Sequence, residues 1–150
     1  MFKTIVLALD GSEGSRRAIP VAVELAKRDE ARVVAVHVAD RRVPQPGAAG
    51  ASPEAEAARA DAEKLSAQGI DTEVKVSSTV AGGPAVQIAD IANQEDADVI
   101  VIGTRGHGGF TGLLVGSVTQ RLLHVAHRPV LAVPPVATPQ AREAATGRLS

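Results

Sequence analysis

The chain has 150 residues, of which 45% are apolar and 22% charged, with a formal net charge of −1 and no cysteine. This is the composition of a globular protein, and it excludes disulfide bonds and cysteine-based zinc sites as well as the broad basic surface of a DNA-binding or membrane-surface protein. Two phenylalanines are the only aromatic residues, so the chain offers no stacking platform for single-stranded nucleic acid, and its core must consist of Val, Ile, Leu and Ala.

The length fits a single domain that can bury a sizeable core. The N-terminus has one lysine, Lys3, before a short strand-like run, which is unlike a signal peptide. No apolar stretch approaches the roughly 20 residues of a membrane-spanning helix. We therefore expect a cytoplasmic protein that binds neither nucleic acid nor a membrane.

Strand-like and helix-like segments alternate along the chain, which indicates an α/β fold with a parallel sheet. The expected strands cover residues 4–9, 31–39, 72–77, 98–103 and 129–133. Helices are expected after the first strand to about residue 28, over residues 54–68, from Gly82-Gly83-Pro84 onward, and over residues 117–127. Residues 40–53 are predicted as a surface loop. Residues 135–150 are predicted as a flexible tail to a domain of residues 1–134.

The spacing of apolar residues predicts which helix faces point inward. In the first helix the inner face is expected to be formed by Ile19, Val23 and Ala26. The corresponding residues of the next two helices are Ala55, Ala58, Ala62, Leu65, Ile88, Ile91 and Ala92. Gly69 is the expected C-cap of the second helix.

Right-handed crossovers restrict the order of five parallel strands. The half-polar strand 72–77 and the proline-bounded strand 129–133 fit best at the two edges, which gives the order 3-2-1-4-5. The chain reverses direction between strands one and four, so a ligand cleft is expected at their carboxyl ends. Asp10 ends the first strand, and a glycine-rich loop follows the fourth.

That loop is the most informative segment of the sequence. It reads Gly103-Thr-Arg-Gly106-His-Gly-Gly-Phe-Thr-Gly-Leu-Leu-Val-Gly116-Ser117 and precedes the last helix. Glycines let main-chain N–H groups approach a ligand, and the first N–H groups of a helix have no partner within it. Asp and Glu are absent from the first turn of this helix, so the position that favours negative charge is left for a phosphate.

Two common phosphate-binding motifs do not fit the loop. A P-loop requires a Gly-Lys pair, and the chain contains none. The G-x-G-x-x-G fingerprint fails because Thr111 stands where its third glycine belongs, and that motif follows the first strand rather than the fourth.

The spacing Gly103-x2-Gly106-x9-Gly116-Ser117 resembles the G-x2-G-x9-G-[S/T] signature of universal stress proteins, in the subgroup that binds ATP. The resemblance covers about residues 1–134 and includes Asp10-Gly-Ser12, Gly83-Pro84 and Arg128-Pro-Val-Leu-Ala-Val-Pro134. It implies a five-stranded, Rossmann-like fold, ATP with Mg²⁺ as ligands, and a nucleotide-responsive role in stress or signalling. It also implies a homodimer formed through the last strand, Pro129–Val133, which is a predicted sheet edge.

The resemblance and the topology together predict a set of nucleotide-binding residues. Asp10 could contact the ribose or hold Mg²⁺, which prefers oxygen ligands, or it could be only an Asp-Gly turn residue. Val38 matches a position whose main chain contacts adenine. The expected set is Ala8, Leu9, Asp10, Gly11, Ser12, Val38, Gly103, Thr104, Arg105, Gly106, Gly116, Ser117, Val118 and Thr119.

Several residues have a second interpretation. Ser117 could contact phosphate or merely cap its helix. Arg105 and His107 could meet phosphate, although surface loops often carry such residues by chance. His124 and His127 are three residues apart and form a candidate metal pair, but polar residues in a last helical turn also suit the helix dipole.

Two other functions remain open alongside an ATP-binding module. One is a nucleotide-dependent hydrolase or phosphotransferase, and the other is a dimeric interaction module of the same fold that binds no nucleotide. Because the chain lacks a P-loop lysine and has no evident catalytic base, we expect at most slow ATP hydrolysis.

Overall fold

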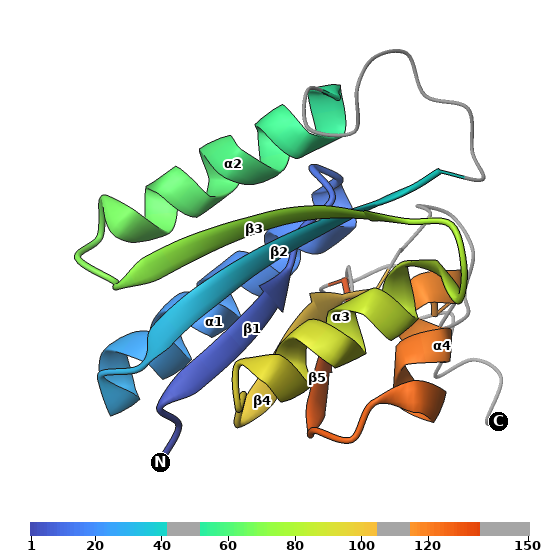
Figure 1. Ribbon diagram of the computed structural model, residues 1–150. Coiled ribbons are helices and arrows are strands. Elements are labelled where there is room, and N and C mark those ends of the chain that lie inside the picture. Colours follow the sequence, from blue (N-terminus) through green and yellow to red (C-terminus); the bar gives the residue numbers. More distant parts are fainter. Residues whose placement is uncertain (42–51, 105–114, 136–150) are drawn as a thin grey trace, which may run out of the picture.

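The computed structural model describes residues 1–41, 52–104 and 115–135. In this part of the chain, five parallel strands form a sheet with the order β3-β2-β1-β4-β5, as the sequence predicted, and helices cover both faces (Figure 1). The strands are β1 (Thr4–Ala8), β2 (Arg32–Asp40), β3 (Thr72–Thr79), β4 (Val99–Gly103) and β5 (Val130–Val133). The helices are α1 (Glu13–Asp29), α2 (Pro53–Ser66), α3 (Gly83–Gln94) and α4 (Ser117–Val125).

Two aliphatic layers hold the helices against the sheet. Side chains alternate between the faces of a strand, so Ile5 and Leu7 of β1 pack with α1 and α2, whereas Val6 and Ala8 pack with α3 and α4. Every residue of β1 is buried, which explains its nearly continuous apolar sequence. The core is aliphatic, as the composition predicted.

The residues that α1 buries most deeply differ in part from those that the sequence predicted. Ala18, Ala22 and Ala26 are at most 2% exposed, whereas Ile19 and Val23 are only partly buried. A stripe of alanines lets the helix axis lie close to the sheet, and the bulkier aliphatic side chains then pack along its flanks. The inner residues predicted for α2 and α3 are all buried.

Some predicted boundaries are corrected by the structure. Asp40 still belongs to β2 and Pro53 opens α2, so the connection between them is shorter than predicted, and its residues 42–51 lie outside the described residues. The C-cap of α2 is Ala67 rather than Gly69. Gly69 lies two residues beyond this cap and has a left-handed φ of 79°. The predicted tail lies outside the described residues from residue 136 onward.

None of the helices in the described ranges combines the length and the apolar content that a bilayer-crossing segment needs.

Asp98 fastens the amino end of β1. Its carboxylate accepts hydrogen bonds from the main-chain N–H groups of Lys3, at 2.7 Å, and Thr4, at 2.9 Å. The N–H of Asp98 in turn donates to the carbonyl of Thr4. The hydrogen bonds from Thr4 and Lys3 favour the charged carboxylate and hold the pKa of Asp98 below its ordinary value.

Replacing Asp98 by Asn should therefore destabilise the fold in a pH-dependent manner. Because the folded-state pKa is lowered, the contribution of the carboxylate is fully present above the unfolded pKa of about 4 and is lost as the pH falls through the folded value. We expect the variant to lose about 1 kcal/mol of unfolding free energy at neutral pH. Urea titrations over a pH series should show this difference shrinking in acid, and a difference that stays constant with pH would contradict the assignment.

Candidate functional site

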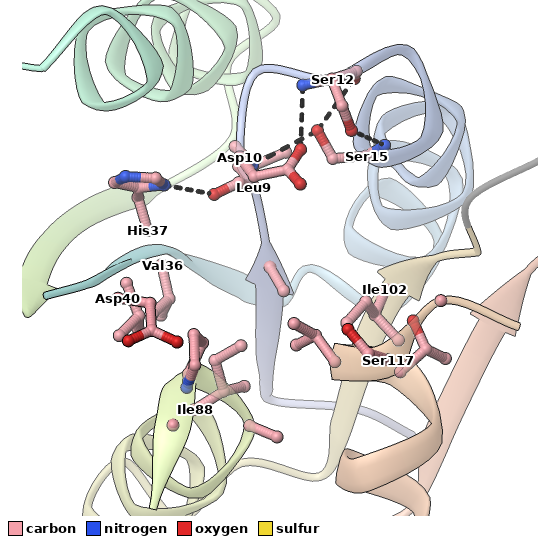
Figure 2. Close-up of a pocket in the computed structure, with 18 of the residues that line it drawn as sticks. Leu9, Asp10, Ser12, Ser15, Val36, His37, Asp40, Ile88, Ile102 and Ser117 are labelled. Carbon is pink, nitrogen blue, oxygen red and sulfur yellow. Dashed lines mark hydrogen bonds between the residues drawn. The ribbon is translucent and has the colours of Figure 1, made fainter. Parts of the chain in front are cut away.

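The central strand ends before its two neighbours. β1 pairs with β2 as far as Ala8, opposite Val36, and with β4 as far as Leu7, opposite Val101. β2 continues to Asp40, and β4 continues to Gly103. The carboxyl edge of the sheet is therefore open above β1, and a cleft of about 960 Å³ lies there. Figure 2 shows the cleft between the ends of β1, β2 and β4 and the first turns of α3 and α4.

The segment after β1 forms one wall of the cleft. An oxygen of the Asp10 carboxylate accepts a hydrogen bond from the N–H of Ser12 at 2.9 Å, and Ser12 caps α1 by accepting from the N–H of Ser15 at 3.2 Å. Gly11 has a φ of 76°, and a Cβ on it would lie 2.7 Å from the Cβ of Ala57. Asp10 is therefore a turn residue, as one interpretation predicted, and it also lines the cleft.

The helix N-termini divide into two kinds. Ser12 caps α1 and Ser52 caps α2 through their side chains, and both helices have acidic residues in the first turn. The N-caps of α3 and α4 are the glycines Gly82 and Gly116, which make no side-chain cap bond, and neither helix has an acidic residue in its first turn. Both of these open N-termini line the cleft. The first N–H groups of a helix have no partner within the helix itself, and the positive end of its dipole lies there.

Ser117 does not cap α4. Gly116 occupies the N-cap position, and Ser117 is the first helical residue, exposed at the edge of the cleft. The capping interpretation of Ser117 is therefore wrong. Thr119, two residues later, is buried and donates its hydroxyl hydrogen to the carbonyl of Gly103 at 3.3 Å. This bond ties the start of α4 to the end of β4.

The charges around the cleft are predominantly acidic. The titratable side chains that line it in the described residues are Asp10, His37, Asp40, Glu54 and Arg121. In Figure 2, Asp40 lies on the side of β2 and α3, opposite Ser117, with Asp10 above β1 between them. Among the described residues, no three His, Asp or Glu side chains are grouped closely enough to hold a metal by themselves. A polyanion in this cleft would therefore benefit from a cation that it brings with it.

Most of the predicted nucleotide-binding residues line the cleft. They are Ala8, Leu9, Asp10, Gly11, Ser12, Val38, Gly103, Gly116, Ser117, Val118 and Thr119. Thr104 is not among the lining residues: it is 4% exposed, and both its N–H and its hydroxyl donate to the carbonyl of Val133. Its hydrogen bonds extend the pairing of β4 with β5 instead.

The remaining predictions on the loop are not tested by the structure. Arg105, Gly106 and His107 lie outside the described residues. The histidine pair is not supported, because α4 ends at Val125 and leaves His127 beyond the helix that carries His124.

Sequence reasoning missed several cleft residues. Asp40 ends β2, the neighbour of β1, and its carboxyl end lies at the same edge of the sheet, so extending the search to that strand could have found it too. The Gly-Gly-Pro start of α3 is also followed by a first turn without acidic residues, which is the same signal that the sequence gives at α4. His37 carries no local signal, since its neighbours are those of any buried strand.

Gly103 has a packing role that its motif does not reveal. A Cβ at this position would overlap the carbonyl oxygen of Gly14 and would lie 2.6 Å from the carbonyl carbon. The end of β4 therefore touches the first turn of α1 backbone to backbone. This contact sets where the glycine-rich loop leaves the sheet.

The chain is similar to known proteins in both its sequence and its fold. Residues 1–134 match the family model described as the universal stress protein family. A universal stress protein of Thermus aquaticus is 38% identical over 143 residues, covering 89% of this chain and 99% of its own length. A solved structure of a universal stress protein family member from Burkholderia pseudomallei is 30% identical and has a TM-score of 0.65, covering 88% of this chain and 96% of its own. A universal stress protein solved in complex with cAMP is 26% identical with a TM-score of 0.62, covering 88% of this chain and 96% of its own.

The contact between Gly103 and Gly14 can be tested by adding a single methyl group. Gly103→Ala forces a shift of the helix or strand backbone, and we expect a loss of unfolding free energy at or above the 1–3 kcal/mol typical of overpacking. Gly69→Ala is the matched control, because nothing lies within 4 Å of its added Cβ and its cost is limited to roughly 1 kcal/mol of left-handed backbone strain. Chemical denaturation of both variants measures the difference, and equal losses would show that the close approach is absent.

Proposed function

Because this chain belongs to the universal stress protein family, we propose that it is an ATP-binding member whose bound nucleotide controls its part in a stress or signalling response. The observation that carries the proposal is the open N-terminus of α4. It follows a glycine N-cap, has no acidic residue in its first turn, and lines the cleft at Ser117.

The phosphates are assigned to this N-terminus. The main-chain N–H groups of the first turn of α4 and the Ser117 hydroxyl are donors suited to phosphate oxygens. The helix dipole favours negative charge at the same place. The spacing of Gly103, Gly106 and Gly116 supports ATP in particular, since it matches the signature of the ATP-binding subgroup.

The nucleoside is assigned to the other side of the cleft. Asp10, above β1, has carboxylate oxygens that can accept hydrogen bonds from ribose hydroxyls, and Val38 on β2 lines the wall where the base would lie. The related protein solved with cAMP supports an adenine nucleotide as the ligand class.

The described residues also fit Mg²⁺ that arrives with the nucleotide. Magnesium sites in nucleotide-binding proteins commonly use one or two carboxylates together with phosphate oxygens and water. Asp10 is our proposed protein ligand. When bound, the ion would neutralise phosphate charge next to the acidic side chains of the cleft.

We propose binding rather than rapid turnover. Main-chain donors hold a phosphate equally well before and during bond cleavage, and such uniform binding does not raise the catalytic rate. The cytoplasmic location stays a prediction.

The charge of one N-cap residue should decide whether phosphate binds. Asp is a favourable N-cap that stabilises a helix, so Gly116→Asp should leave the melting temperature unchanged or raise it while repelling phosphate. Gly116→Asn is the matched control, because it has the same shape and capping ability without the charge. We expect the Asp variant to bind ATP with Mg²⁺ at least about tenfold more weakly than the Asn variant. Equal affinities in isothermal titration calorimetry would show that the phosphates bind elsewhere.

We also propose that two copies associate through β5. This strand lies at the edge of the sheet, where unpaired backbone groups invite a partner strand. Leu131 on β5 is 39% exposed and Leu123 on α4 is 54% exposed. A symmetric pairing of β5 strands would cover these apolar side chains.

Replacing Leu131 by Lys should convert the proposed dimer to a monomer, because two buried ammonium groups would face each other across the two-fold axis. Val80→Lys is the control, since Val80 is 64% exposed on the connection between β3 and α3. Sedimentation velocity should give a dimer for the wild type and for this control. A monomeric wild-type protein at high concentration would rule out the interface.

A further inference from the structure

The regular hydrogen bonding between β1 and β2 stops one bond early, because the last carbonyl of the series accepts from a side chain instead. The N–H of Leu9 donates to the carbonyl of Val36 at 2.8 Å. In a parallel ladder, the next bond would run from the N–H of Val38 to the carbonyl of Leu9. Within the described residues that bond is not formed, and the register of the two strands ends at Ala8 opposite Val36.

His37 takes the place of the missing donor. Its Nδ1 lies 2.9 Å from the carbonyl oxygen of Leu9, as Figure 2 shows. A carbonyl can only accept a hydrogen bond, so Nδ1 carries the proton and Nε2 is left as an acceptor. The residue is 4% exposed, and its Nε2 is buried without a hydrogen-bond partner among the described residues. An unpaired buried acceptor destabilises a fold, so packing alone does not explain an imidazole here.

The alternation of N–H directions along β2 points the main chain of Val38 toward the cleft. Odd-numbered residues of β2 direct their N–H groups to the β3 side, as the bond from Val33 to the Asp71 carbonyl shows. Even-numbered residues direct theirs to the β1 side, as the bond from Arg32 to the Lys3 carbonyl shows. Val38 therefore points its N–H and its C=O toward the side where β1 has ended, and it lines the cleft there.

We propose that His37 is a positioning residue for the base of the nucleotide. By holding the Leu9 carbonyl, its imidazole prevents β1 from pairing with Val38 and keeps the Val38 N–H available as a donor. This inference rests on the proposed nucleotide binding. It adds that the His37 side chain keeps the main-chain groups of Val38 accessible to the base. A base with a ring-nitrogen acceptor beside an amino group, as in adenine, complements an N–H and C=O on one side of a strand. Guanine presents the two groups in the reverse order, with a carbonyl where adenine has its amino group and an N–H where adenine has its ring acceptor.

Two variants separate this role from simple packing. His37→Leu removes the donor and the unpaired acceptor together, so the Leu9 carbonyl becomes free to accept from the Val38 N–H. His37→Asn keeps an N–H donor at the same distance from the backbone as Nδ1, and it should rescue the wild-type behaviour.

Amide hydrogen exchange of ¹⁵N-labelled protein followed by NMR gives the direct readout. In the wild type without nucleotide, the Val38 amide should exchange rapidly, and ATP with Mg²⁺ should protect it. In His37→Leu the same amide should be protected without nucleotide, and ATP affinity measured by calorimetry should fall about tenfold. His37→Asn should exchange and bind as the wild type does.

The outcomes distinguish this inference from the proposed function. A wild type that binds no ATP would remove the proposed function, whereas a Val38 amide that becomes protected only in His37→Leu would still establish how His37 acts on the ladder. A Val38 amide already protected in the wild type without nucleotide would overturn the inference. So would equal losses of ATP affinity in His37→Leu and His37→Asn with unchanged exchange, because the ring would then serve packing alone.

Discussion

β1 stops pairing with β4 at Leu7 and with β2 at Ala8, while both neighbours continue, and the main chain beyond that point must find other hydrogen-bond partners. The Asp10 N–H donates to the Ser15 hydroxyl at 3.3 Å, and the Leu9 carbonyl accepts from His37. These two hydrogen bonds replace strand pairing and keep the segment after β1 apart from its neighbouring strands. The cleft therefore exists because the central strand is shorter than its two neighbours. The hydrogen bonds that the main chain makes beyond the end of β1 then position the residues around the cleft.

Close contacts at two glycines hold the carboxyl edge of the sheet in place. Gly103 lies against the carbonyl of Gly14, and Gly11 leaves room for Ala57, so neither position accepts a side chain without movement. The hydrogen bond from Thr119 to the Gly103 carbonyl adds the start of α4 to this arrangement. Glycine at position 103 is thus explained by contact between helix and strand, even though it also borders the cleft. A site held by such contacts is positioned before any ligand arrives, which reduces the entropic cost of binding.

The caps of the four helices explain the chemistry that this edge can support. α1 and α2 have the serine caps Ser12 and Ser52 and acidic residues in their first turns, whereas α3 and α4 have glycine N-caps without a side-chain cap bond and no acidic residue in the first turn. The carboxylates of Asp10 and Asp40 lie at the same edge. Open helix N-termini suit an anion and carboxylates suit a cation, so the arrangement is complementary to a phosphate accompanied by a metal ion.

The sequence by itself determined the elements, the strand order and the place of the cleft, because apolar runs, crossover handedness and the reversal of strand order are local or topological rules. It also predicted that Asp10 and Gly116 border the cleft, because one follows the first strand and the other precedes the last helix. It did not find the alanine stripe of α1, since its centre depends on how closely that helix approaches the sheet. It missed His37 and assigned Gly103 to the ligand alone. His37 meets the Leu9 carbonyl across 28 residues of chain, and Gly103 meets the first turn of a distant helix. Only the tertiary structure decided these contacts, because they arise from strand register and helix position, which no local pattern encodes.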